Sequence, residues 1–372
     1  MPSSPAGTLT GDRDLRIDSL RGLALCVLMV SHLNFDIFKW VWNSLGHTSF
    51  AELFVFMSGL VSGIVYWKLL NRTSAREVRA RAGARAKLIY FTYLGLVVYI
   101  TVYTHTVRSL GIDFIPWRGT LLVEDPALTF ALAPFFIYQP GFSDVLPMYC
   151  IFMLLVPVVL PQIQRGRQWI VLAASVGLWI AAQQGAFPAL MKPFIHRFGV
   201  RLVYFDPFAW QILFVFGLWF GARHAAGRPV RLPKSHVFAW ALVPPLLVSF
   251  AIRHQIFFDA SVAEAAAAIT HRHNLDALRL LNFAALAYLG VRISEQHPAW
   301  FEWRWLAYLG QHSLQVFSYS VAAAYLGWTV AGDATIAGQL AFAALAITSL
   351  TLPAWVHVRY RARSTARVES AG

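Results

Sequence analysis

The chain has 372 residues, of which 58% are hydrophobic and only 13% are charged. Soluble domains carry about twice that share of charged residues, so this composition excludes an ordinary soluble protein. The formal net charge is +13, but the basic residues fall in alternate loops between apolar runs, so we expect no nucleic-acid partner. The apolar runs are too long for barrel strands, which predicts an all-α, polytopic integral membrane protein.

About ten apolar segments are long enough to be transmembrane helices around a central lumen. They lie near residues 17–38, 50–70, 87–108, 144–163, 168–185, 207–224, 236–256, 275–293, 305–329 and 335–358. Residues 127–139 are apolar but short and contain Pro134, so we expect a re-entrant or interfacial piece there. The predicted transmembrane domain covers 16–358, between a short disordered tail at 1–15 and a basic tail at 359–372.

Lys and Arg residues are distributed unevenly between the two sets of loops. The amino terminus, the loops after even-numbered segments and the carboxyl terminus hold 21 of them, and the opposite loops hold eight. The positive-inside rule therefore predicts that both termini, and both tails, are cytoplasmic.

The first apolar segment contains Arg21 and His32, eleven residues apart. Eleven residues make about three helical turns, so both side chains share one face and lie roughly 16 Å apart. Ionisable groups inside a span are costly, which makes the pair a candidate functional site. The alternative is a snorkelling interfacial pair of Arg21 with Asp18, and a hydrogen-bonded core histidine. We expect Asp36, one turn beyond His32, to orient the imidazole.

The second segment runs back across the membrane and begins near Glu52. This carboxylate returns to about the depth of His32. His32, Asp36 and Glu52 therefore form a predicted general-base cluster.

Small residues follow in the same segment, at Ser58, Gly59, Ser62 and Gly63. For the two glycines, this spacing is typical of close helix packing. Ser58 lies deeper than Glu52, between the levels of Arg21 and His32, where it can face the same lumen.

The strongest basic cluster lies between the second and third segments and includes Arg81, Arg85 and Lys87. Membrane topology alone explains most of this charge. A diphosphate or 3′-phosphate of a long donor can also be clamped at this mouth by Arg81 and Arg85, close to Arg21, because guanidinium groups match phosphate geometry. The predicted donor-binding residues are Arg21, Asp18, Ser58, Arg81 and Arg85.

Polar and aromatic residues open the fourth and sixth segments on the predicted outer face. They are Asp144 in the fourth, and Asp206, Trp210 and Gln211 in the sixth. Carboxylates, an indole and an amide near an outer mouth suit a sugar acceptor. Helix capping by the two aspartates is an equally weighted alternative.

The eighth segment carries Arg279 and Asn282, one turn apart inside the membrane. We group both with the acceptor side. An intramembrane arginine must find a partner, and Asp144 or Asp206 are the candidates.

Neither a disulfide nor a metal site is expected. Cys26 and Cys150 both lie in apolar runs, and no pair of histidines has convincing metal-ligand spacing.

Together these motifs resemble the OpgC family, membrane succinyltransferases that act on osmoregulated periplasmic glucans. The likeness runs through Leu15–Ala24 with His32, Ala51–Gly59, Asp144–Tyr149 with Pro157, Asp206–Gln211 with Phe214 and Gly217, and Leu309–Leu314 with Val316 and Phe317. It covers almost the whole chain, in order. The Arg-x10-His spacing also resembles the wider acyltransferase-3-like superfamily. One departure is Asp206, where the family pattern has asparagine.

The resemblance implies a multi-pass protein of the bacterial inner membrane, with His32 as the catalytic histidine and Arg21 as its partner. The implied reaction moves an acyl group, with succinyl expected, from cytoplasmic acyl-coenzyme A to a hydroxyl of a periplasmic glucan. Succinyl-coenzyme A would be a co-substrate, with no permanently bound cofactor. The expected partners are membrane lipids, the acyl-coenzyme A donor, a glucan or other glycan acceptor, and proteins of glucan synthesis.

Several alternatives stay open at this point. A glycan or acyl-donor transporter or flippase shares the span count, but it predicts an inverted repeat that the sequence does not show. An acetyltransferase of the same fold could modify another envelope polysaccharide. Direct attack of the sugar hydroxyl and an acyl-histidine intermediate are equally compatible with the residues.

Overall fold

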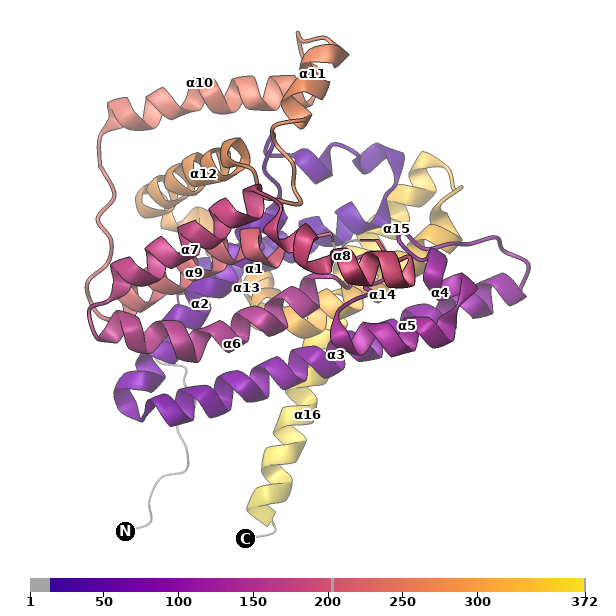
Figure 1. Ribbon diagram of the computed structural model, residues 1–372, viewed down its shortest axis with the longest axis horizontal. Helices are drawn as coiled ribbons and strands as arrows, with labels where there is room; N and C mark the ends of the chain where they lie inside the picture. The colour runs from indigo at the N-terminus through magenta and orange to yellow at the C-terminus, as the bar shows by residue number, and fades with distance from the viewer. Residues whose placement is uncertain (1–13, 202–203, 371–372) are drawn as a thin grey trace.

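The computed structural model describes residues 14–201 and 204–370 as a helical bundle (Figure 1). Its α-helices are α1 (Leu15–Leu33), α2 (Phe50–Arg72), α3 (Ala75–Ser109), α4 (Thr120–Glu124), α5 (Pro126–Leu132), α6 (Val145–Gln164), α7 (Gln168–Gln183), α8 (Ala186–Phe198), α9 (Pro207–Ala225), α10 (His236–Arg253), α11 (Ala260–Ala267), α12 (Ala277–Gln296), α13 (Arg304–Gln311), α14 (Ser313–Ala331), α15 (Ile336–Ser349) and α16 (Thr351–Ser370). Short 3-10 turns are η1 (Asp36–Phe38), η2 (Val41–Asn43), η3 (Ala133–Phe135) and η4 (Pro298–Phe301). The tail predicted at 1–15 lies outside the described residues up to residue 13, and so do the last two residues of the tail predicted at 359–372.

All ten predicted segments coincide with a helix or with a pair of consecutive helices. By length and composition, six helices can cross a membrane: α2, α3, α6, α10, α12 and the run Ile336–Tyr360. The bent pair of α7 and α8 raises the number to seven if it is one span. The chain is therefore an all-helical membrane protein, while the count of ten spans and the cytoplasmic termini stay predictions.

Three helix boundaries differ from the sequence prediction. Helix α1 ends at Leu33 rather than near residue 38, because Asn34 adopts the left-handed conformation, with φ 54°. Gly185, with φ 76°, ends α7, and α8 continues at an angle of 52° where a loop was expected. The predicted segment 305–329 is broken at His312, which separates α13 from α14.

The segment predicted as re-entrant forms a short apolar helix over Pro126–Phe135. Helix α3 holds it in place, since the Tyr93 hydroxyl donates to the carbonyls of Ala133 at 3.2 Å and Tyr138 at 2.9 Å. In Figure 1, α4 and α5 lie beside the end of α3. This anchoring fixes the chain that leads into α6, where Asp144 lies.

Helices α2 and α9 pack with their backbones in contact, as the small residues of α2 predicted. A Cβ atom added at Gly59 would overlap the carbonyl oxygen of Phe214, and one at Gly63 would overlap that of Leu218. Such close approach needs glycine on the contacting face. It places the α2 side chains from Phe54 onward at the centre of the bundle.

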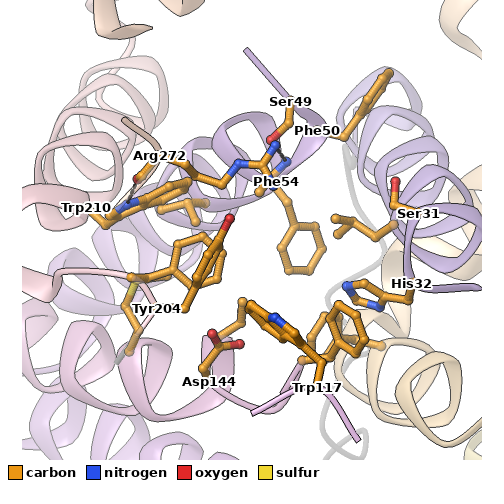
Figure 2. Close-up of a pocket in the computed structure, with 18 of the residues that line it drawn as sticks. Ser31, His32, Ser49, Phe50, Phe54, Trp117, Asp144, Tyr204, Trp210 and Arg272 are labelled. Atoms are coloured by element: carbon orange, nitrogen blue, oxygen red, sulfur yellow. Dashed lines mark hydrogen bonds between the residues drawn. The ribbon is translucent and has the colours of Figure 1, made fainter. Parts of the chain in front are cut away.

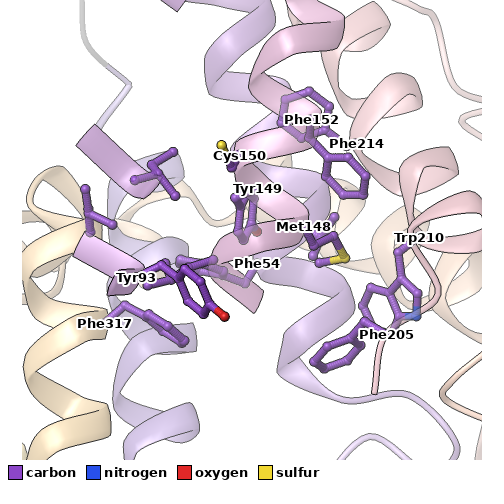
Figure 3. Close-up of a cluster of buried hydrophobic side chains, with 14 of the residues drawn as sticks. Phe54, Tyr93, Met148, Tyr149, Cys150, Phe152, Phe205, Trp210, Phe214 and Phe317 are labelled. Atoms are coloured by element: carbon purple, nitrogen blue, oxygen red, sulfur yellow. The ribbon is translucent and has the colours of Figure 1, made fainter. Parts of the chain in front are cut away.

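Helix α1 is held in the same way against α13. Gly22 contacts the backbone of Leu306, and Gly310 contacts the backbone of Asp18. At the other end of α1, the Trp328 indole of α14 donates to the carbonyl oxygen of His32 at 2.8 Å. These contacts turn Arg21 and His32 toward the interior, where Figure 3 shows the buried aromatic core around Phe54.

Candidate functional site

His32 lies one residue before the end of α1 and is 7% exposed. Its ring packs against Phe142, with centroids 4.2 Å apart, and edge-on against Phe317 at 6.2 Å. Among the described residues, its Nδ1 atom has no hydrogen-bond partner. A buried polar atom is normally paired, so the imidazole is held by packing with one nitrogen left for another molecule.

Beside His32 is a narrow cavity with aromatic walls, called here the His32 cavity (Figure 2). Its side chains come from α1, α2, α6, α9, α14 and five connecting segments, and include Ser31, His32, Ser49, Phe54, Trp117, Phe142, Asp144, Tyr204, Trp210, Arg272 and Phe317. The volume is about 50 Å³, which holds a few water molecules but no sugar ring. A sugar can therefore react here only after the aromatic walls move apart.

Asp144 faces His32 from the opposite side of this cavity (Figure 2). The residue precedes α6, but its side chain makes no capping hydrogen bond. Its Oδ2 atom is buried without a hydrogen-bond partner among the described residues. The cavity thus has an unsatisfied acceptor on one side and the His32 nitrogen on the other, an arrangement suited to a hydroxyl group between them.

A second and wider cavity, the Arg21 cavity, has a volume of about 410 Å³. Arg21 donates to the Ser313 hydroxyl at 2.6 Å and lies 3.7 Å from Asp18. The cavity also contacts Ser58 and Arg85. It follows α2 from Phe54 to Tyr66, a helix length of about 18 Å, so it fits a long, thin ligand.

The break before α14 adds a further feature to the Arg21 cavity. Ser313 is the first residue of α14 and lies beside Gln311 on the cavity wall. A helix amino terminus carries unpaired N–H groups and a partial positive charge, which favour phosphate. Arg21, Arg85 and this terminus therefore all line the Arg21 cavity.

The two cavities share the walls formed by Phe54, Val145 and Phe317. The rings of Phe54 and Phe317 are stacked, with centroids 6.3 Å apart, and both are labelled in Figure 3. We call these three side chains the aromatic partition. The Arg21 and His32 cavities are neighbours separated by one layer of side chains.

Comparison with protein families gives a match to the family model described as OpgC protein, over residues 13–362. The chain belongs to the OpgC family. Comparisons with curated proteins and with solved structures found no match. Membership of the OpgC family indicates a role in the modification of osmoregulated periplasmic glucans.

The predicted general-base cluster of this OpgC protein is not assembled. Because α1 ends at Leu33, Asp36 is no longer one helical turn beyond His32; it is exposed and pairs with Lys39 at 2.9 Å. Glu52 is fully buried, but it pairs with Arg279 and accepts from the Ser49 hydroxyl at 2.6 Å. Both carboxylates have other partners, and neither lines the His32 cavity.

The intramembrane Arg279 has a different partner from those predicted. It binds Glu52 rather than Asp144 or Asp206, because α12 packs beside the start of α2. Asn282, one turn on, donates to the Thr48 hydroxyl at 2.6 Å. Both residues hold the loop before α2 and lie outside the His32 cavity.

The predicted acceptor residues separate into two groups. Asp206 caps α9, since its carboxylate accepts from the N–H of Phe208 at 2.8 Å, and burial raises its pKa. Gln211 pairs with Ser175 at 2.7 Å. Only Asp144 and Trp210 line the His32 cavity. The capping interpretation therefore holds for Asp206 and fails for Asp144.

The two arginines predicted to bind the donor phosphates, Arg81 and Arg85, have different surroundings. Arg85 lines the Arg21 cavity, whereas Arg81, one turn earlier, is exposed and pairs with Glu77 at 2.6 Å. Ser58 lines the cavity as predicted for a lumen-facing residue.

The predicted site residues did not include Trp117, Phe142, Tyr204 and Arg272, which line the cavity. All four lie in connecting segments, where no helical period shows which way a side chain points. The only local signal is the run His271-Arg272-His273 in a loop, which is polar enough to attract attention but does not indicate a cavity.

Proposed function

We propose that the protein is an inner-membrane O-acyltransferase that moves a succinyl group from cytoplasmic acyl-coenzyme A to a hydroxyl of a periplasmic glucan. One observation carries the proposal. A buried histidine, whose Nδ1 atom has no hydrogen-bond partner among the described residues, lines a small aromatic cavity that one layer of side chains separates from the long Arg21 cavity. Family membership supports the glucan as the acceptor.

The Arg21 cavity suits the donor in length and charge. The phosphates of acyl-coenzyme A would lie near Arg21, Arg85 and the first residue of α14. A pantetheine arm would then follow α2 over about 18 Å to the aromatic partition. Ten spans with both termini in the cytoplasm, as the positive-inside rule predicts, put the Arg21 end of α1 on the cytoplasmic side.

The His32 cavity suits the chemical step. His32 accepts the hydrogen bond of the attacking sugar hydroxyl and removes its proton as the oxygen attacks the thioester carbonyl. Asp144 accepts from a second hydroxyl of the sugar and so positions it. The carbon–sulfur bond then breaks, and the imidazolium returns the proton to the leaving thiolate. Trp117, Tyr204 and Trp210 offer ring faces to a sugar once the cavity has opened.

The acyl-histidine route uses the same residues in two steps. His32 first attacks the thioester and releases coenzyme A, and the sugar oxygen then attacks the acyl-imidazole. Rapid quenching of the protein with labelled donor and no acceptor distinguishes the two routes, since only the second leaves label on His32.

The test is transfer of label from succinyl- or acetyl-coenzyme A to linear or cyclic glucan by purified protein. We expect transfer from succinyl-coenzyme A by the wild type and none by His32→Ala. His236→Ala is the matched control, because His236 is exposed at the start of α10. Near-normal transfer by His32→Ala would refute the proposal. Faster transfer from acetyl-coenzyme A than from succinyl-coenzyme A would show that the transferred group is acetyl rather than succinyl.

A further inference from the structure

A third cavity, beyond the His32 cavity, is lined chiefly by cationic and imidazole side chains. Its volume is about 530 Å³, and six of its eleven lining residues are Lys39, His47, Arg253, His271, Arg272 and Arg279. We call it the cationic pocket. It opens to solvent, because the Lys39 side chain is 70% exposed.

Among the described residues, three carboxylates form ion pairs with side chains that line the cationic pocket, and the pocket has four Lys and Arg side chains. Asp36 pairs with Lys39, Asp276 with His271, and Glu52 with Arg279. These three carboxylates face four Lys and Arg side chains, since Arg253 and Arg272 also line the pocket. Clustered cations repel one another unless an anion lies among them.

Two buried nitrogen atoms in the pocket also lack a hydrogen-bond partner among the described residues. Arg279 is 4% exposed and its Nη2 atom has no hydrogen-bond partner among the described residues. His47 is 7% exposed; its Nδ1 atom lies 2.9 Å from the Ser249 hydroxyl, but its Nε2 atom has no partner within the same part of the chain. Buried unpaired polar atoms are rare in folded proteins, and the guanidinium donor of Arg279 indicates a missing acceptor.

The electrostatic effect of this clustering extends to His47. Burial, together with the positive charges of Arg253 and Arg279, lowers the pKa of His47 to about 4. The ring is therefore neutral at pH 7, while the surrounding guanidinium groups remain charged. The potential inside the pocket is positive.

The cationic pocket adjoins the proposed reaction centre. Tyr204 and Arg272 line both this pocket and the His32 cavity. Figure 2 shows Arg272 on the same side of the cavity as Ser49, across from Asp144. The loop is fixed there, because the Trp210 indole donates to the carbonyl of Arg272 at 3.0 Å.

We propose that the cationic pocket is an anion-binding subsite that holds a carboxylate or phosphate group next to the His32 cavity. This rests on the proposed function for its place in the reaction. Two sources can supply the anion. In a succinyl thioester the free carboxylate carbon is about 4 Å from the thioester carbon, within reach of Arg272 at the shared wall. Alternatively, the anion is a substituent of the glucan that enters from solvent.

The first experiment measures binding without catalysis. Purified protein in the His32→Ala background is titrated with succinate, inorganic phosphate and uncharged succinamide, with thermal unfolding as the readout. We expect both anions to stabilise the protein and succinamide to have no effect. Arg253→Gln and Arg272→Gln should weaken anion binding about tenfold or more, as expected on loss of a charged hydrogen bond.

Arg197→Gln is the matched control, since Arg197 is exposed in the last turn of α8, outside the pocket. If Arg253→Gln does not fold, Lys39→Gln is used instead. Lys39→Gln should weaken anion binding only a few-fold, because Lys39 is largely exposed. The proposal is overturned if anions bind no better than succinamide, or if the control weakens binding as much as the pocket variants. This experiment measures binding and not transfer, so it can refute the anion subsite whether or not the protein is a transferase.

The second experiment distinguishes the two sources. Transfer is measured with succinyl- or butyryl-coenzyme A, onto uncharged or phosphate-bearing glucan, by wild type and Arg272→Gln. A rise in KM confined to succinyl-coenzyme A assigns the pocket to the acyl carboxylate. A rise confined to the phosphate-bearing glucan assigns it to the acceptor. An equal rise for the pair with no anion would contradict the proposal.

Discussion

The Arg21 cavity and the His32 cavity differ in size and in the chemistry of their walls. The first has a volume of about 410 Å³ and contacts Arg21, Arg85 and several hydroxyl groups. The second has a volume of about 50 Å³ and is walled mainly by aromatic rings. If the protein has the proposed function, a long charged donor is bound in one compartment and the transfer takes place in another. The small volume and aromatic walls of the second compartment would then limit the access of water to the thioester.

The largest effect is expected at a buried pair that belongs to neither cavity. Glu52→Gln removes the charged partner of Arg279 and should cost about 3–5 kcal/mol, since an unpaired buried charge remains. Asp36→Ala should leave stability and transfer within twofold of the wild type, because Asp36 is exposed. Fluorescence-detected size exclusion and thermal unfolding measure the first effect. A well-folded, inactive Glu52→Gln protein would instead restore Glu52 as a candidate base.

The next largest effect is expected in the His32 cavity, at Asp144. Asp144→Asn should reduce transfer about 100-fold, the scale for losing a positioned group in proton transfer, because Asp144 faces His32. Asp206→Asn should be nearly neutral, because asparagine caps helices as well as aspartate does. The ratio of kcat values between the two variants is the measurement. Equal losses would show that Asp144 has only a structural role.

The donor side predicts an effect on binding rather than on the chemical step. Arg21→Gln should raise the KM for acyl-coenzyme A about tenfold, as expected for a charged hydrogen bond. Arg81→Gln should change it less than twofold, because Arg81 is exposed and paired with Glu77. Initial rates at varied donor concentration separate the two. An unchanged KM in Arg21→Gln would remove Arg21 from donor binding.

The smallest effect concerns the partition between the cavities. Phe317→Ala removes a ring from the wall that both share, so water should reach the thioester and donor hydrolysis without acceptor should rise a few-fold. Phe91→Ala is the control, since Phe91 is 65% exposed on α3. Release of free thiol, followed over time, reports the hydrolysis. Hydrolysis that stays at the wild-type rate would mean that the partition is not the barrier.

Much of this arrangement follows from local sequence patterns. Apolar runs predicted the helices, the eleven-residue spacing predicted that Arg21 and His32 share one face, and the small residues of α2 predicted close packing against another helix. These features depend on residues within one helix, where the period of 3.6 residues fixes direction.

Features that depend on distant parts of the chain could not be predicted in this way. The pairing of Glu52 with Arg279 joins residues 227 apart, and Arg272 reaches the His32 cavity from a loop. Single residues also stop helices without a strong sequence signal, as Asn34 does after α1 and His312 does before α14. Because α1 ends at Leu33, Asp36 is not on the helix with His32, and because the chain breaks at His312, the start of α14 lines the Arg21 cavity.

Helix α10 has one further consequence for the cationic pocket. None of its residues is buried, and Figure 1 shows it at the edge of the bundle above α12. Near its amino end, Phe238 packs edge-on against Tyr288 of α12, with ring centroids 5.1 Å apart. Its carboxyl end is joined to the loop before α2, through His254 with Asn43 at 2.9 Å and Ser249 with His47. Arg253 is the last residue of this exposed helix, so its place in the cationic pocket depends on the contacts of that end.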